Sequence, residues 1–137
     1  MRKKIFLLLL IAIISVDSWA QGKHHRHHSH STHNLPAWAA SHNYKGMSHV
    51  YFPDYYSFYD PQRGGYVFWD NGKWAFTPAL PPYMSNTDMS KTRIQILKGL
   101  SLDLHPETNY PHYMKLYPPI PGNEKVPVPT PGPSLGQ

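Results

Sequence analysis

The centre of the chain reads YYSFYDPQRGGYVFWDNGKWAFT (residues 55–77), in which large aromatic residues alternate with other residues around two turn sequences. One turn is Asn71-Gly72, and these residue types readily adopt the positive φ that both central positions of a type I′ hairpin turn require. A hairpin closed there places Trp69 opposite Trp74, at a non-hydrogen-bonded position where cross-strand side chains approach most closely. This stretch therefore predicts an antiparallel hairpin.

The other turn sequence is Pro-Gln-Arg-Gly at residues 61–64, with proline and glycine where a type I turn favours them. A four-residue loop there places Phe58 opposite Val67 and predicts a three-stranded meander. The two registers, derived from separate turns, assign residues to the faces of the sheet in the same way. This agreement supports both registers, because a slip of one residue would mix the two faces. One face collects Tyr56, Phe58, Val67, Trp69, Trp74 and Phe76. The other face carries Ser57, Tyr59, Tyr66, Phe68, Ala75 and Thr77.

Two interpretations of these aromatic residues are open. Aromatic side chains bury the most area per residue and favour strands, so we favour a role in the core of a small sheet. The alternative is a stacking platform for a glycan, formed by Tyr59, Tyr66 and Phe68, which requires that this second face be exposed.

Further elements flank the meander. Residues 49–52 predict an edge or lead-in segment, because Pro53 follows them. Residues 92–97 (TRIQIL) predict another strand, and residues 100–104 either a fifth strand or the approach to a helix. Residues 106–117 predict a short helix with apolar residues at helical spacing, which must pack on the sheet to persist. The predicted fold class is α+β, mainly β: a small antiparallel three- to five-stranded meander with one short C-terminal helix and disordered termini.

The N-terminus predicts export. Residues 1–20 have a basic start, a run of twelve apolar residues and a small-x-small end at Ala20, as in a secretory signal peptide. The apolar run is shorter than the roughly 20 residues that span a bilayer, and we expect no transmembrane segment after its removal. The chain has no cysteine, which excludes disulfides and thiolate metal sites. We expect the protein in the periplasm, at the cell surface or outside a Gram-negative bacterium.

Residues 21–48 predict a disordered, His-rich arm, because a segment this polar cannot build a core. The alternatives for its role are a solvated linker, a segment that becomes cationic in mild acid, and a transition-metal site. Neutral imidazole is a suitable ligand for Zn²⁺, Cu²⁺ or Ni²⁺. The candidate metal ligands are His24, His25, His27, His28, His30 and His33. A short apolar patch at residues 35–40 either docks onto the domain or stays mobile.

The domain itself is predicted to span residues 49–118. Residues 119–137 are rich in proline and predict a polyproline-II-like or disordered tail, either a plain terminus, a spacer or a recognition segment.

Catalytic motifs are missing from the sequence. It contains no nucleophile elbow, HExxH motif or glycine-rich phosphate loop, and His105 and His112 have no third zinc ligand at a suitable spacing. We therefore expect no enzymatic activity and no cofactor other than a metal on the arm. The net charge of +5 is too small to predict nucleic-acid binding.

Several motifs resemble those of a group of short exported proteins of Bacteroidota that carry signal peptides. They are the Tyr-rich YFPDYYSFYD at residues 51–60, GYVFWDNGKW at residues 65–74 and the Leu-Pro pair that follows. The strand at residues 92–97 and NYPHYMKLYP at residues 109–118 occur in the same order as in that group. The resemblance covers about residues 50–118 and implies export, but it implies no functional residue.

We therefore predict a structural or interaction module of the bacterial cell envelope, with an envelope polymer or an envelope protein as its partner. The alternative is a periplasmic transition-metal-binding protein that uses the His-rich arm.

Overall fold

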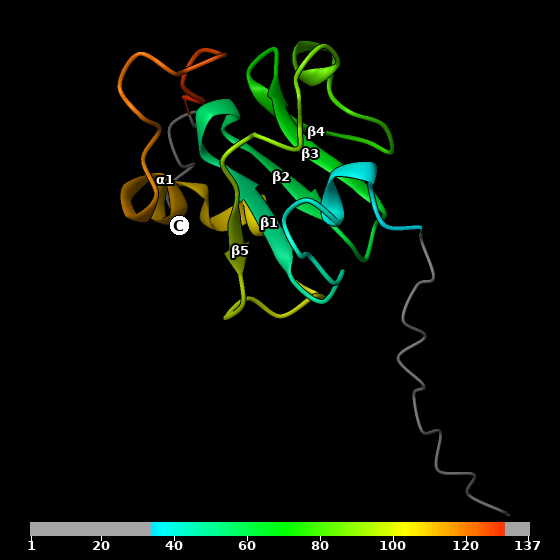
Figure 1. Cartoon of the computed structure of the whole chain (residues 1–137). Coiled ribbons are helices and arrows are strands. Elements are labelled where there is room, and N and C mark those ends of the chain that lie inside the picture. The colour runs from blue at the N-terminus through cyan, green and yellow to red at the C-terminus, as the bar shows by residue number, and fades with distance from the viewer. Residues whose placement is uncertain (1–33, 131–137) are drawn as a thin grey trace, which may run out of the picture.

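The structure is a computed structural model that describes residues 34–130, and within them five strands form one antiparallel sheet. The order in the sheet is β4-β3-β2-β1-β5, so the first four strands form a meander and β5 pairs back onto β1 (Figure 1). The strands are β1 (His49–Phe52), β2 (Ser57–Asp60), β3 (Gly65–Asp70), β4 (Lys73–Thr77) and β5 (Gln95–Leu97). The predicted fold class, mainly β with one short helix, is confirmed.

The register predicted from the two turns is also confirmed. Trp69 pairs with Trp74 across β3 and β4, and Phe58 pairs with Val67 across β2 and β3. The φ angles of Asn71 and Gly72 are 48° and 83°, the positive values that the type I′ turn requires.

The neighbours of β1 differ from the prediction. We expected residues 49–52 at the edge of the sheet, but β1 lies between β2 and β5. Pro53 is compatible with this position, because it lies after β1, at the start of the 3₁₀ turn η2 (Pro53–Tyr55). The missing N–H group of Pro53 therefore removes no hydrogen bond from the sheet. Residues 100–104 form turns instead of a strand, and β5 is therefore the last strand.

One face of the sheet is covered by the predicted helix, which begins as the 3₁₀ turn η4 (Pro106–Asn109) and continues as α1 (Tyr110–Leu116). Its Tyr113 ring lies 5.8 Å from the Phe58 ring, centroid to centroid, in an edge-to-face contact. The cover that the apolar face requires is therefore α1. The buried residues on this side are Tyr51, Tyr56, Phe58, Val67, Leu97, Tyr110 and Tyr113, which we call the helix-side cluster.

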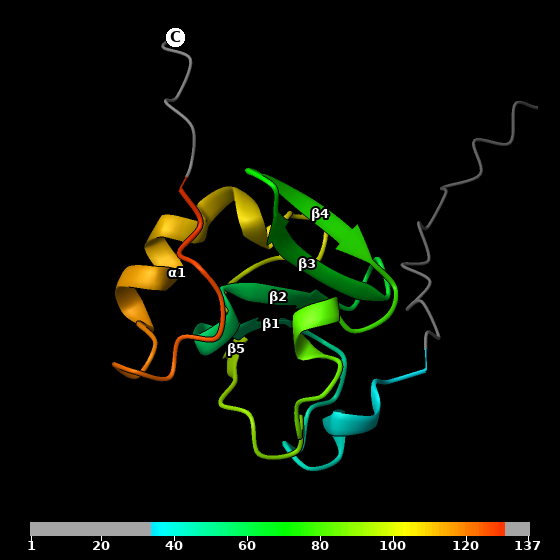
Figure 2. The same ribbon diagram turned by 90° about the horizontal axis from the view of Figure 1, so that it is seen from above.

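The opposite face is covered by the N-terminal segment and by the residues after β4 (Figure 2). These segments contain the 3₁₀ turns η1 (Ala37–Ala39) and η3 (Pro82–Met84). The Trp38 side chain is 4% exposed, and its indole Nε1 donates a hydrogen bond of 2.8 Å to the Tyr66 hydroxyl. The buried residues on this side are Trp38, Ala39, Tyr44, Val50, Phe52, Tyr55, Tyr59, Tyr66, Met84 and Met89, which we call the N-terminal-side cluster.

The prediction of a disordered arm is therefore wrong for residues 34–48. The apolar patch at residues 35–40 docks onto the domain, because the Trp38 ring is buried in the core and its N–H group donates a hydrogen bond to Tyr66. The predicted signal peptide, the rest of the arm at residues 21–33, and residues 131–137 lie outside the described residues.

The glycan platform proposed for the second face is also ruled out. Tyr59 and Tyr66 are each 4% exposed, and Phe68 packs against Tyr83 at a ring separation of 5.9 Å. Tyr59 and Tyr66 contribute to the core, and Phe68 is half-buried, so the three rings do not form an open platform for a sugar.

The first part of the proline-rich tail lies along the domain. The Ile120 N–H donates to the Asp54 carboxylate at 3.2 Å, and the Lys125 N–H donates to the Asp54 carbonyl at 2.9 Å. Val126 packs against the helix-side cluster. The prediction of a free tail is therefore wrong for residues 119–130, because Asp54 provides acceptors that an extended backbone cannot provide for itself.

Truncating Trp38 is expected to destabilise the fold. Trp38→Ala should lower the free energy of unfolding by about 3–5 kcal/mol, because it opens a cavity and leaves the Tyr66 hydroxyl without its donor. Met47→Ala is the control, since Met47 is 66% exposed, and its effect should stay within about 0.5 kcal/mol. Urea denaturation measures both, and similar unfolding curves for the two variants would contradict the assigned role of Trp38.

Candidate functional site

A hollow lies at the β5 edge of the sheet. It has a volume of about 890 Å³ and is lined by His42, by residues of the segment 94–100 and by residues of the segment 109–117. We call it the β5 groove. One side of β5 pairs with β1, and the other side pairs with no strand between residues 34 and 130. The groove therefore runs along an unpaired sheet edge.

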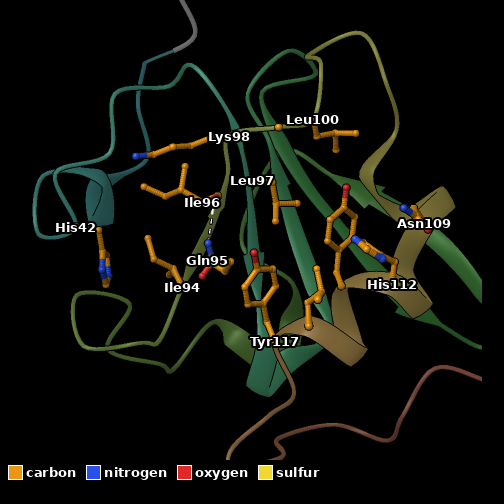
Figure 3. Close-up of a pocket in the computed structure, with 13 residues that line it drawn as sticks. His42, Ile94, Gln95, Ile96, Leu97, Lys98, Leu100, Asn109, His112 and Tyr117 are labelled. Carbon is orange, nitrogen blue, oxygen red and sulfur yellow. Dashed lines mark hydrogen bonds between the residues drawn. The ribbon is translucent and has the colours of Figure 1, made fainter.

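The two walls of the β5 groove continue the two clusters of the core (Figure 3). Ile94 and Ile96 pack against the N-terminal-side cluster, on the side where His42 lies. Leu97 belongs to the helix-side cluster, Leu100 packs against it, and both face α1. Alternate residues of a strand point to opposite faces, so β5 contributes apolar side chains to both walls.

The β5 groove also contains polar side chains, those of His42, Gln95, Lys98, Asn109 and His112. The Gln95 side-chain amide donates a hydrogen bond of 3.0 Å to the Ile96 carbonyl, and His42 Nε2 lies 2.9 Å from the Met89 carbonyl oxygen. Lys98 and His112 are exposed, and none of the groove's lining residues is a carboxylate. The groove therefore combines aliphatic and aromatic side chains with polar ones, and its lining contains a lysine and no acidic residue.

A chain of charged groups holds the start of the helix against the sheet. Asp60 is 2% exposed, and its Oδ1 accepts hydrogen bonds from the backbone N–H groups of Gln62 and Arg63 at 2.9 and 3.0 Å. The Arg63 guanidinium bonds the other oxygen of Asp60 through Nε and lies 3.1 Å from Glu107 in η4. Glu107 also lies 3.3 Å from His105. This network fixes η4, and with it one wall of the β5 groove.

The buried pair of His49 and Asp60 was not predicted. His49 is fully buried on β1, its Nε2 lies 3.6 Å from Asp60 Oδ1, and neither ring nitrogen has a hydrogen-bond partner. The sequence offered no sign of this pair, since Asp60 was explained by its turn and His49 by a strand. The His49 ring has no access to solvent, so we assign it no chemistry with a ligand.

The environment of Asp60 alters its acidity. Burial opposes ionisation of this carboxyl, but the neighbouring His49 and the hydrogen bonds from Arg63 outweigh burial and lower the pKa of Asp60 from 3.8 to about 2. The ionised form is therefore favoured in the folded state.

The predicted metal ligands are not placed by the structure, because His24, His25, His27, His28, His30 and His33 all lie outside the described residues. Within residues 34–130, no group of three or more His, Asp or Glu side chains could hold a metal ion. His105 contacts Glu107, whereas His112 lines the β5 groove. None of the helices between residues 34 and 130 is both long and apolar enough to cross a membrane.

Comparisons with protein-family models, with curated proteins and with solved structures found no match for this chain. The argument for function therefore rests on the β5 groove, and the resemblance to exported proteins of Bacteroidota stays a prediction.

Acid should destabilise the protein partly through Asp60. Its pKa is lower in the folded state, so its contribution is complete above the unfolded value of 3.8 and is lost as the pH falls towards about 2. This contribution is about 2 kcal/mol in the free energy of unfolding. Guanidinium denaturation between pH 2 and pH 6 should show a shallower pH dependence for Asp60→Asn than for the wild type.

Asp88→Asn is the control for this experiment. Asp88 forms an exposed ion pair with Lys91, which solvent screens, so its removal should change the pH dependence less. Parallel pH profiles for the wild type and Asp60→Asn would show that Asp60 does not carry the effect.

Metal binding by the arm is testable with a deletion that spares the core. Calorimetric titration with Zn²⁺, Cu²⁺ and Ni²⁺ compares the chain from residue 21 onward with a chain that starts at residue 34, so that Trp38 is kept. We expect binding only by the longer chain, and weaker binding at pH 5, because protonated imidazole is not a ligand. Equal binding by both chains, or only millimolar binding by the longer one, would argue against the metal hypothesis.

Proposed function

We propose that this protein is an exported, non-enzymatic interaction module of a Gram-negative cell envelope, and that it binds a segment of another envelope protein in the β5 groove. The observation that carries the proposal is the contrast between the faces of the sheet and its β5 edge. Both faces are covered by the chain's own segments over β1 and β2, with β4 left partly exposed, whereas the edge at β5 opens into a groove of about 890 Å³. An unpaired sheet edge is a template for another chain.

The walls of the β5 groove favour a protein partner over a wall or surface polymer. They consist largely of aliphatic and aromatic side chains, and Leu116 at the rim is 53% exposed. Apolar anchors of a protein segment can be buried against these side chains, and the backbone of such a segment can also pair with the free edge of β5, which a polysaccharide cannot do.

The proposal assigns no reaction to the groove. Among its lining residues no carboxylate is present, His42 is engaged with the Met89 carbonyl, and His112 has no acidic lining residue to orient its ring for catalysis. This arrangement supports binding as the activity.

Export is a separate part of the proposal and rests on residues 1–20. When the full chain is expressed in a Gram-negative host, we expect the protein in the periplasmic fraction with Gln21 as its first residue. Intact-mass measurement reads this directly, and an uncleaved chain in the cytoplasm would contradict export.

Binding in the β5 groove is tested with peptides selected from a random displayed library on the mature chain. Leu116→Asp should raise the dissociation constants of these peptides about tenfold or more, because it puts a charge on the apolar wall. Leu104→Asp is the matched control, since Leu104 is 52% exposed and does not line the groove. Calorimetry gives the constants. The proposal fails if no peptide is enriched or if the two variants bind the enriched peptides equally well.

A further inference from the structure

We propose that the β5 groove takes an extended peptide that pairs with β5 as a sixth strand, and that this peptide carries a carboxylate next to Lys98. The inference rests on the proposed function and deepens it by stating how the partner binds and which chemistry it presents. It follows from the free edge of β5, from the two walls beside that edge and from the charges of the groove.

The three-residue β5 is short and is followed by Lys98, and both features limit pairing, but the strand itself carries fewer of the devices that protect a sheet edge than β4 does. At the opposite edge, β4 begins with Lys73 and is followed directly by Pro78, and lysine and proline both discourage pairing with another chain. β5 has neither within its three residues. Its Ile96 carbonyl accepts a hydrogen bond from the Gln95 side chain, a partner that a peptide N–H group could replace.

The two walls of the β5 groove suit the alternating side chains of an added strand. Every second residue of such a strand would point towards Ile94 and Ile96, and the residues between them towards Leu97 and Tyr117. Both walls contain apolar side chains, so the groove favours a short run of apolar residues over an alternating apolar–polar pattern. The added strand would continue both clusters of the core.

The chain's own segments outside the structure do not fit this site. Residues 21–33 contain no aliphatic or aromatic residue to fill the walls, and they carry Lys and Arg together with the six histidines. Residues 131–137 contain two prolines, which have no N–H group to donate to β5. Residues 1–20 contain an apolar run but are removed on export under the proposed function, so the occupant that we propose is a segment of a different protein.

The charge of the groove indicates the chemistry of that segment. Lys98 directly follows β5 and is exposed, and His42 and His112 are the other ionisable groups of the lining besides its tyrosines. None of the lining residues is acidic, so a carboxylate on the peptide has a positive partner and no negative neighbour in the groove. An acidic side chain and a free C-terminus supply the same group.

The test uses synthetic peptides and the mature chain. The probe is acetyl-Ser-Thr-Val-Ile-Val-Glu-amide, compared with the same peptide ending in Gln-amide and with one ending in glutamine with a free carboxylate. We expect a peptide whose carboxylate reaches Lys98 to bind about threefold more tightly than the neutral peptide. The two charged peptides show whether a side-chain carboxylate, a C-terminal carboxylate or both can do so. Lys98→Gln should abolish this preference, whereas Lys115→Gln, an exposed lysine of α1 outside the groove lining, should preserve it.

Backbone pairing is tested by methylating amide nitrogens of the probe. Only alternate N–H groups of an added strand face β5, so the isoleucine N–H and the two valine N–H groups of the probe point to opposite sides. Methylating the set that faces β5 should weaken binding about tenfold, and methylating the set that faces away should have little effect. NMR should place the shifted amide signals at residues 94–98. A peptide bound as a helix or as polyproline II would not show this alternation.

The outcomes separate this inference from the proposed function. If library peptides respond to Leu116→Asp but the methylated probes do not alternate, strand pairing is wrong and the interaction module stands. If the charged and neutral probes bind equally, the carboxylate is wrong. If sedimentation shows a dimer that Leu116→Asp dissociates and that the probes do not displace, the occupant is a second copy and the inference is overturned.

Discussion

The pairing of Phe58 with Val67 across β2 and β3 is the constraint on which the rest of the structure depends. It assigns every residue of the meander to one face or the other, and both faces are then rich in aromatic side chains. A sheet of this size cannot leave either face in water, because an isolated meander buries too little apolar area to be stable. Two further layers are therefore required, and segments on either side of the meander in the sequence provide them.

The charged network at the β2–β3 turn determines where the helical layer sits. Asp60, Arg63 and Glu107 are partly or fully buried, and buried charges contribute little net stability even when they are paired. Their main effect is to specify position, because η4 can satisfy Arg63 in one place only. Since α1 continues from η4, the same network sets the distance between the helix and β5.

The β5 groove is a consequence of this architecture. Within residues 34–130, β5 is short and pairs only with β1, and the groove beside it is flanked by His42 and by α1. The surface that remains after folding is therefore neither a sheet face nor a helix but an edge between two walls. Such an edge offers backbone hydrogen bonds and apolar contacts together, which is the basis of peptide recognition by strand addition.

The sequence alone determined the meander, its register and the helix at residues 106–117, because these depend on turn chemistry and on spacing within short stretches. Asn71-Gly72 and the loop after Asp60 are local signals of this kind. Tertiary structure alone decided the docking of Trp38, the central position of β1 and the groove beside β5. The hydrogen bond between Trp38 and Tyr66 joins residues 28 apart, and the groove joins three separate segments, so no local pattern encodes either. These contacts exist because two apolar faces needed cover, and the sequence pattern does not specify which distant segment supplies it.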